Sequence, residues 1–162
     1  MQRYFDFSKN DDWETPAEYL KIITPFLNKE NIIYDPFYFN GKIKEKWENL
    51  GYECIHKNEN FYDVDVPANK NIIIVSNPPY HNKNKMLKKL FDWDLPFILL
   101  MPIQTIAMVK TQRLLKNKNI QIIIPNIYKG FISKDGKQTK CPPFYICYIC
   151  YNMNLERDII YL

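Results

Sequence analysis

A buried strand that stops at two prolines is the feature that most constrains this fold. Residues 72–75 are four consecutive apolar residues, which predicts a strand buried on both faces. They lead into Ser76-Asn77-Pro78-Pro79-Tyr80, where two prolines fix the backbone and remove two N–H donors. The residue before each proline is also driven out of the helical region. The sequence therefore predicts a stiff turn that presents an amide, two carbonyls and an aromatic ring, a set that suits a flat group bearing an amino substituent.

Other apolar runs alternate with segments of helical periodicity. Continuous apolar strands alternating with helices indicate an α/β fold whose mostly parallel sheet is covered by helices on both faces. No helix separates the last two strands, so we expect them to form an antiparallel C-terminal pair at one edge of the sheet. Besides residues 72–76, strands are predicted at residues 31–35, 52–56, 97–101, 120–124 and 144–151, helices at 15–27, 42–50, 83–91 and 104–116, and a long loop at 128–143.

Capping residues indicate where two of these helices begin and end. Thr15 is predicted as the N-cap of the first helix, with Pro16 as its first residue and Glu18 completing a capping box. Pro25 is expected to end that helix early. Gly51 is predicted to end the second helix in a left-handed conformation.

Length and charge limit the domain organisation and the partners. A chain of 162 residues suits one domain, over residues 1–162, in which the polar residues 1–12 are expected to be flexible. The net charge of +4 permits a polyanionic partner without requiring one. No signal segment is recognised, and prolines interrupt the apolar residues 95–109, so we expect no membrane span and an intracellular protein.

The four cysteines predict reduced thiols and no metal site. Cys147 and Cys150 lie three residues apart in a predicted strand, so their side chains should point to opposite faces. Cys54 and Cys141 stand apart from them in the sequence.

Polar and aromatic loops follow three predicted strands, at the sheet edge where ligands of open α/β folds bind. With these loops, the chain resembles the class I, S-adenosylmethionine-dependent adenine methyltransferases that act on amino groups. It is most similar to the small DNA adenine methylases of phages and giant viruses, which implies a Rossmann-like fold. Four segments carry the resemblance, in the family's order: Trp13-Glu14-Thr15-Pro16, Asp35-Pro36-Phe37-Tyr38-Phe39-Asn40-Gly41, Asn60-Phe61-Tyr62 and Asn77-Pro78-Pro79-Tyr80.

The resemblance implies methylation of the exocyclic amino group of adenine in DNA. The Asn77 side-chain oxygen and the Pro78 carbonyl would accept the two amino hydrogens, and Tyr80 would stack on the flipped base. Thr15 would bind the methionine carboxylate of the cofactor, and Asn60 and Phe61 would contact its adenine. The implied catalytic residues are Asn77, Pro78, Pro79 and Tyr80, and the implied cofactor residues are Trp13, Thr15, Pro16, Asp35, Pro36, Phe37, Tyr38, Gly41, Asn60 and Phe61. Lys83, Lys85 and Lys88 are candidates for phosphate contacts.

The segments implied to bind the cofactor depart from the family pattern. The first cofactor loop keeps only the last glycine, Gly41, and Asn60 stands in place of an aspartate. His56 and Lys57 follow the second strand, where the family has a ribose-binding acid, and Glu59 is the nearest replacement. The short span between Gly41 and Asn77 predicts a shortened sheet.

Several alternatives stay open. An RNA adenine methyltransferase would use the same catalytic motif, because the motif does not read the sugar. Enzymes that methylate protein glutamine share it too, but they carry a full glycine-rich loop. A non-catalytic nucleic-acid-binding or partner subunit would explain the altered cofactor loop, although it would not need the intact Asn77 motif. Since no separate target-recognition domain is predicted, surface loops or an oligomeric partner would recognise the target. A location in the cytoplasm, the nucleus, a viral factory or a virion fits each alternative.

Overall fold

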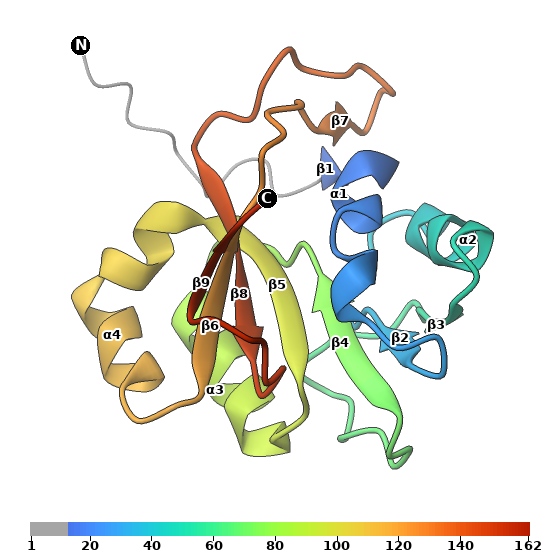
Figure 1. Ribbon diagram of the computed structural model, residues 1–162. Coiled ribbons are helices and arrows are strands. Elements are labelled where there is room, and N and C mark those ends of the chain that lie inside the picture. The colour runs from blue at the N-terminus through green and yellow to red at the C-terminus, as the bar shows by residue number, and fades with distance from the viewer. Residues whose placement is uncertain (1–12) are drawn as a thin grey trace, which may run out of the picture.

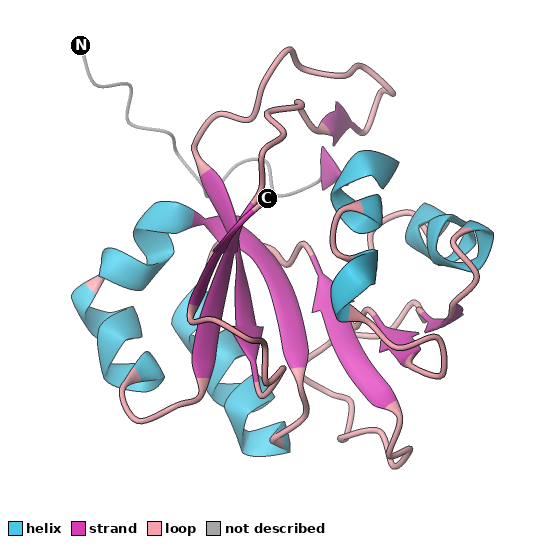
Figure 2. Ribbon diagram, viewed as in Figure 1, coloured by secondary structure: helices cyan, strands magenta, loops and turns pink. Residues whose placement is uncertain are grey.

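The computed structural model describes residues 13–162, in which a seven-stranded mixed sheet lies between two layers of helices (Figures 1 and 2). Residues 1–12, which we expected to be flexible, lie outside the described residues. The α/β class is confirmed. The strands are β1 (Trp13–Glu14), β2 (Ile32–Tyr34), β3 (Glu53–Ile55), β4 (Ile72–Ser76), β5 (Phe97–Pro102), β6 (Ile120–Ile124), β7 (Ile132–Ser133), β8 (Ile146–Tyr151) and β9 (Ile159–Tyr161), and the helices are α1 (Ala17–Lys21), α2 (Lys42–Asn49), α3 (Lys83–Trp93) and α4 (Val109–Leu115).

The strand order places a topological switch point between β2 and β4. The large sheet runs β3-β2-β4-β5-β8-β6-β9, and only β8 is antiparallel to its neighbours. From β2 the chain moves outward to β3 and then returns to β4 on the other side of β2. Ligands of open α/β sheets bind at such a reversal, beyond the carboxyl ends of the two strands. Residues 56–71 between β3 and β4 form neither strand nor helix, as expected for a shortened sheet.

The predicted antiparallel pairing of residues 120–124 with residues 144–151 is confirmed by β6 and β8. The prediction that this pair forms the edge of the sheet was wrong. β8 pairs with β6 and also with β5, so it lies inside the sheet. All six residues of β8 are buried, and such a strand needs neighbours on both sides. Cys147 and Cys150 do lie in the cores on opposite faces of the sheet. β9, which the sequence analysis did not predict, forms the edge beside β6.

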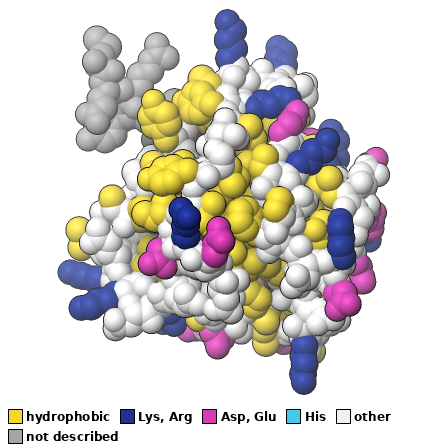
Figure 3. Space-filling model, in the orientation of Figure 1, with side chains coloured by type: hydrophobic (Ala, Val, Ile, Leu, Met, Phe, Trp, Pro, Cys, Tyr) yellow, Lys and Arg dark blue, Asp and Glu magenta, His cyan; other side chains and the backbone are white. Residues whose placement is uncertain are grey.

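Helices cover both faces of the sheet, as predicted. On one face, Tyr19 of α1 and Trp47 of α2 are fully buried against the sheet. On the other face, Leu87 and Phe91 of α3 are buried, and Leu115 of α4 packs beside them. Between α1 and the C-terminal strand, apolar side chains remain partly exposed, as the space-filling view shows (Figure 3).

The first helix differs from its prediction at both ends. Pro16 occupies the N-cap position and no side chain caps the helix, so Thr15 is not the N-cap. The Thr15 side chain instead lines a hollow at the carboxyl edge of the sheet. α1 ends at Lys21, and a separate 3₁₀ turn forms at Thr24–Phe26 because Pro25 has no N–H to donate to the Lys21 carbonyl. The Thr24 hydroxyl donates to that carbonyl at 2.8 Å.

Other helix boundaries follow local backbone chemistry. Gly51 has a φ of +82° and donates its N–H to the Glu48 carbonyl at 2.9 Å, which confirms its predicted role after α2. The helix predicted at residues 104–116 is divided into a 3₁₀ turn at Ile103–Ala107 and α4. Within residues 13–162, no helix combines the length and apolar character that a bilayer crossing requires.

Candidate functional site

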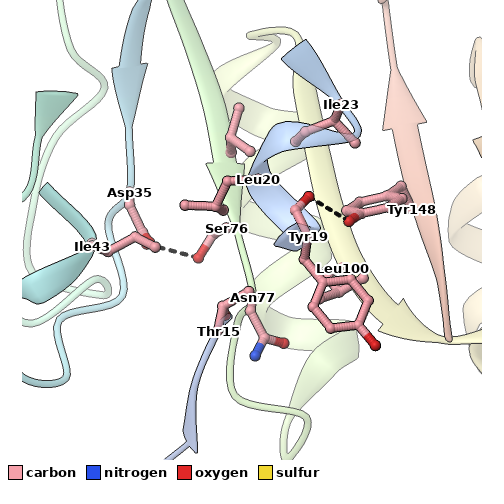
Figure 4. A pocket seen from close by; sticks show the side chains of 11 residues that line it. Thr15, Tyr19, Leu20, Ile23, Asp35, Ile43, Ser76, Asn77, Leu100 and Tyr148 are labelled. Atoms are coloured by element: carbon pink, nitrogen blue, oxygen red, sulfur yellow. Dashed lines mark hydrogen bonds between the residues drawn. The ribbon is translucent and has the colours of Figure 1, made fainter. Parts of the chain in front are cut away.

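Two adjoining hollows lie at the switch point. They contain about 270 and 350 Å³ of space that no atom fills, part of which is open solvent. Thr15, Asp35, Ile43 and Asn77 line both. The close view of the smaller hollow shows Thr15 beside Asn77 and the Asp35 carboxylate facing Ser76 (Figure 4). The structure thus brings together residues from three of the four segments that carry the family resemblance.

Asp35 joins the ends of the two central strands. Its Oδ1 accepts a hydrogen bond from the Ser76 hydroxyl at 2.7 Å and another from the Phe37 N–H at 3.1 Å. Burial raises the pKa of this carboxyl to about 6, although nearby His56 and the Ser76 hydrogen bond act in the opposite direction. Among the described residues no hydrogen bond reaches Oδ2, which leaves this oxygen as an acceptor beside the hollows.

The turn after β4 carries the two predicted acceptors. Asn77 lines both hollows, whereas Pro78 is buried and lines neither. The Tyr80 hydroxyl donates to Asn77 Oδ1 at 2.6 Å. Among the described residues no hydrogen bond reaches the Pro78 carbonyl. Tyr80 is only 8% exposed, and Phe144 packs edge-on against its ring at 5.3 Å. A base could stack on this ring only if its surroundings moved, whereas the contact with Asn77 orients the amide directly.

Glu14 links the N-terminal segment to α2 and the loop before it through hydrogen bonds. Its Oε1 accepts from Lys46 Nζ at 2.6 Å and its Oε2 from Asn40 Nδ2 at 3.0 Å. Lys46 also donates to the Thr15 carbonyl at 2.7 Å, and Lys42 forms a longer ion pair with Glu14 at 3.3 Å. Burial acts to raise the pKa of Glu14, but the hydrogen bonds from Lys46 and Asn40 hold it below its usual range. Only the tertiary fold brings Lys46 of α2 to Glu14, so sequence reasoning missed this network.

We expect Glu14→Gln to lower the free energy of unfolding by about 1 kcal/mol at pH 7, because a partly buried charged hydrogen bond is lost. The folded-state pKa of Glu14 is depressed, so its contribution is present above about pH 4.5 and is lost as pH falls through the folded value. Urea unfolding at pH 7 and pH 3 measures the difference. Glu48→Gln, which removes an exposed ion pair with Lys44 in α2, is the matched control and should change little. An equal loss at both pH values would contradict the assignment.

The loop after β2 contains a tight turn at Gly41 and contacts His56, which follows β3. Gly41 has a φ of +77°, a conformation that favours glycine. A Cβ at this position would also lie only 3.2 Å from the Tyr38 hydroxyl. Tyr38 stacks on His56 with ring centroids 5.0 Å apart. His56 Nδ1 lies 2.9 Å from the Asp35 carbonyl and must donate to it, so Nε2 is the acceptor of the neutral ring. His56 lines the larger hollow. Its position directly after β3 was the sequence signal that could have identified it as a site residue.

The third family segment lies apart from the hollows. Neither Asn60 nor Phe61 lines them. Phe61 is 4% exposed and packs against Phe37, with ring centroids 4.6 Å apart. The Asn60 amide donates to Asp63 Oδ2 at 2.7 Å and accepts from the Tyr62 N–H at 3.2 Å. Asn60 thus stabilises the loop after β3, and Phe61 packs against Phe37.

Trp13 and Phe37 do line the larger hollow, whereas Pro16 and Pro36 are buried in the backbone turns next to it. Pro79 is partly exposed in the turn after β4.

The three candidate phosphate-binding lysines lie in the first two turns of α3. Lys85 and Lys88 are exposed, and Lys83 is partly buried. Lys85 Nζ lies 4.3 Å above the Tyr62 ring. By contrast, Lys89 donates to the carbonyls of Tyr62 and Val64, so it holds the loop after β3.

Within residues 13–162, no three His, Cys, Asp or Glu side chains cluster to hold a metal ion. All four cysteines are free thiols. No protein-family model matches this sequence, and no curated protein matches it.

Proposed function

We propose that this chain is a class I methyltransferase that transfers a methyl group from S-adenosylmethionine to the exocyclic amino group of adenine in DNA. The observation that carries the proposal is the meeting of two strand ends at the switch point. The Asn77 amide and the Pro78 carbonyl follow β4. A buried carboxyl group, Asp35, follows β2 and lines the same hollows as Asn77. Acceptors next to a hollow lined by Asp35 and aromatic rings suit a substrate amino group and a cationic cofactor.

The residues present fit part of the cofactor. Asp35 Oδ2, His56 Nε2 and the Thr15 hydroxyl would serve its ammonium, hydroxyl and carboxylate groups, and Phe37 supplies apolar surface. S-adenosylmethionine, when bound, supplies a methyl group on a sulfonium that a nucleophilic nitrogen can take. Asn60 and Phe61 do not add an adenine pocket in this conformation, because Asn60 is hydrogen-bonded to Asp63 and Phe61 packs against Phe37.

The chain's own groups act mainly by positioning. The lone pair of an adenine amino nitrogen is delocalised into the ring, so the nitrogen is a weak nucleophile. Asn77 Oδ1 and the Pro78 carbonyl would each accept one amino hydrogen, which favours a pyramidal nitrogen. One lone pair of Oδ1 accepts from Tyr80, and the other remains for the substrate. After transfer the nitrogen releases one proton to water, so no general base with a shifted pKa is needed.

Two other functions share this geometry. Methylation of adenine in RNA would use the same acceptors, since none of them reads the sugar. A non-catalytic, nucleic-acid-binding or partner subunit is favoured by the burial of Phe61 and Tyr80, which leaves little ring surface for stacking. Oligomerisation that supplies target recognition is compatible with each function.

Calorimetric titration with S-adenosylmethionine tests the proposal. We expect saturable binding, and no heat at millimolar ligand would overturn the enzyme proposal for this chain. Methyl transfer to adenine-containing DNA and RNA oligonucleotides of the same sequence then identifies the substrate. Binding of cofactor without transfer to either nucleic acid would support the partner-subunit function.

A further inference from the structure

Two exposed tyrosines stack on each other above the carboxyl edge of the sheet. Tyr128 lies just after β6 and Tyr145 just before β8, and they are 50% and 73% exposed. Their ring centroids are 5.7 Å apart, with planes inclined by 30°. This stacked pair, the Tyr128–Tyr145 platform, exposes aromatic surface, most of all on Tyr145, to a flat apolar partner.

The platform is held in place by the loop that carries it. The Tyr128 hydroxyl donates to the Pro142 carbonyl at 3.2 Å, and the Tyr145 carbonyl accepts from the Ile103 N–H at 2.9 Å. At the neck of the loop, a Cβ on Gly130 would lie 1.9 Å from the Thr139 carbonyl oxygen, so the two sides of the loop are in close contact. β7 also pairs with β1, which ties the loop to the N-terminal segment (Figure 1). These contacts reduce the entropy lost when a ligand binds the rings.

A short series of contacts links the platform to the proposed catalytic turn. Phe144, the residue before Tyr145, packs against the ring of Tyr80. The Tyr80 hydroxyl in turn binds Asn77. A polymer whose target group reaches Asn77 would therefore have its neighbouring units near the platform.

The charge around the platform favours a polyanion. Residues 125–145 contain four lysines and one aspartate. Lys134, Lys137 and Lys140 are exposed. The space-filling view shows basic side chains gathered at the top of the molecule, over the part where Figure 1 places this loop (Figure 3). Exposed aromatic rings flanked by cationic side chains are typical of surfaces that bind single-stranded nucleic acid.

We propose that the Tyr128–Tyr145 platform binds a single-stranded segment of nucleic acid next to the target base, with one base stacked on the outer face of Tyr145. This inference rests on the proposed function, and it names the form of the substrate. The unpaired base offers a free π-face, whereas the bases of a duplex are already stacked on each other. Lys134, Lys137 and Lys140 contact the phosphates, and the rings hold the bases, while Lys129 of the same loop is paired with Glu18.

Fluorescence anisotropy with a labelled single-stranded DNA 12-mer, without cofactor, tests the platform. Tyr145→Ala should weaken binding at least about fivefold, because one base-stacking contact is lost. Tyr145→Phe, which keeps the ring, should bind within twofold of the parent. Tyr161→Ala, which removes a 77% exposed tyrosine of β9, is the matched control and should also bind within twofold.

Salt dependence separates stacking from charge. Tyr145→Ala should leave the slope of log affinity against log salt unchanged, whereas replacing Lys134 and Lys137 by Ala should make it shallower, by about 0.7 per lost phosphate contact. Tyr145→Ala binding within twofold of the parent, or tighter binding of duplex than of single strand, would overturn the platform. A parent chain that binds no oligonucleotide would do so too, while the separate cofactor titration still decides whether the chain is an enzyme.

Discussion

Asn77→Ala is expected to reduce methyl transfer to adenine by about 100- to 1000-fold, the usual cost of removing one preorganised polar group from a reacting centre. Asn77 Oδ1 is the side-chain acceptor at the end of β4, and the Tyr80 hydroxyl holds it in place. Without this oxygen, only the Pro78 carbonyl would orient the substrate amino group. Single-turnover transfer of a labelled methyl group to an oligonucleotide measures the loss.

Cofactor affinity separates a catalytic role of Asn77 from a structural one. Calorimetry should show S-adenosylmethionine bound to Asn77→Ala within a few-fold of the parent affinity. Asn49→Ala, which removes an exposed amide at the end of α2, is the matched control and should keep full activity. Tyr80→Phe should lose about tenfold in transfer, since the ring stays and one orienting hydrogen bond goes. Full activity in Asn77→Ala would show that the site is wrongly assigned.

Asp35→Asn is expected to weaken cofactor binding by at least about tenfold, because a charged hydrogen-bond acceptor beside the hollow is lost. The amide keeps nearly the same shape and can still accept from the Ser76 hydroxyl. Asp92→Asn, an exposed substitution on α3, is the control and should bind cofactor like the parent. Unchanged affinity in Asp35→Asn would remove this carboxylate from the proposed cofactor site.

The same substitution should change how stability depends on pH. The pKa of Asp35 rises from about 3.9 in the unfolded chain to about 6 in the folded one, because the carboxyl is buried. Its protonated form therefore favours the fold, and this contribution is complete below about pH 4 and is lost as pH rises through about 6. The loss amounts to roughly 2–3 kcal/mol at 1.36 kcal/mol per pKa unit. Urea unfolding from pH 4 to 7 should show the parent losing this amount relative to Asp35→Asn, and parallel curves would contradict the raised pKa.

Local sequence patterns predicted most of the secondary structure because their signals act over a few residues. The strand at residues 72–76 and the stop at Gly51 follow from apolar continuity and from a left-handed φ. The helix predicted from residue 15 was less accurate, since Thr15 faces a hollow and Pro25 interrupts the hydrogen-bonding pattern. The place of β8 inside the sheet was also missed, because strand order depends on burial against distant strands.

The α/β class and the rigid Asn-Pro-Pro-Tyr turn at the end of a buried strand could be predicted from the sequence, because apolar runs and proline geometry act locally. Tertiary structure alone decided which groups meet there. It joined Asp35 to Ser76, set Lys46 on Glu14, and placed Asn60 and Phe61 away from the hollows. It also turned Tyr80 inward, so that its hydroxyl holds the Asn77 amide. The contacts of Asp35 and Glu14 join residues far apart in the chain, and the contact of Tyr80 with Asn77 depends on the packing around the turn. The close packing of the whole sheet sets the distances between these groups.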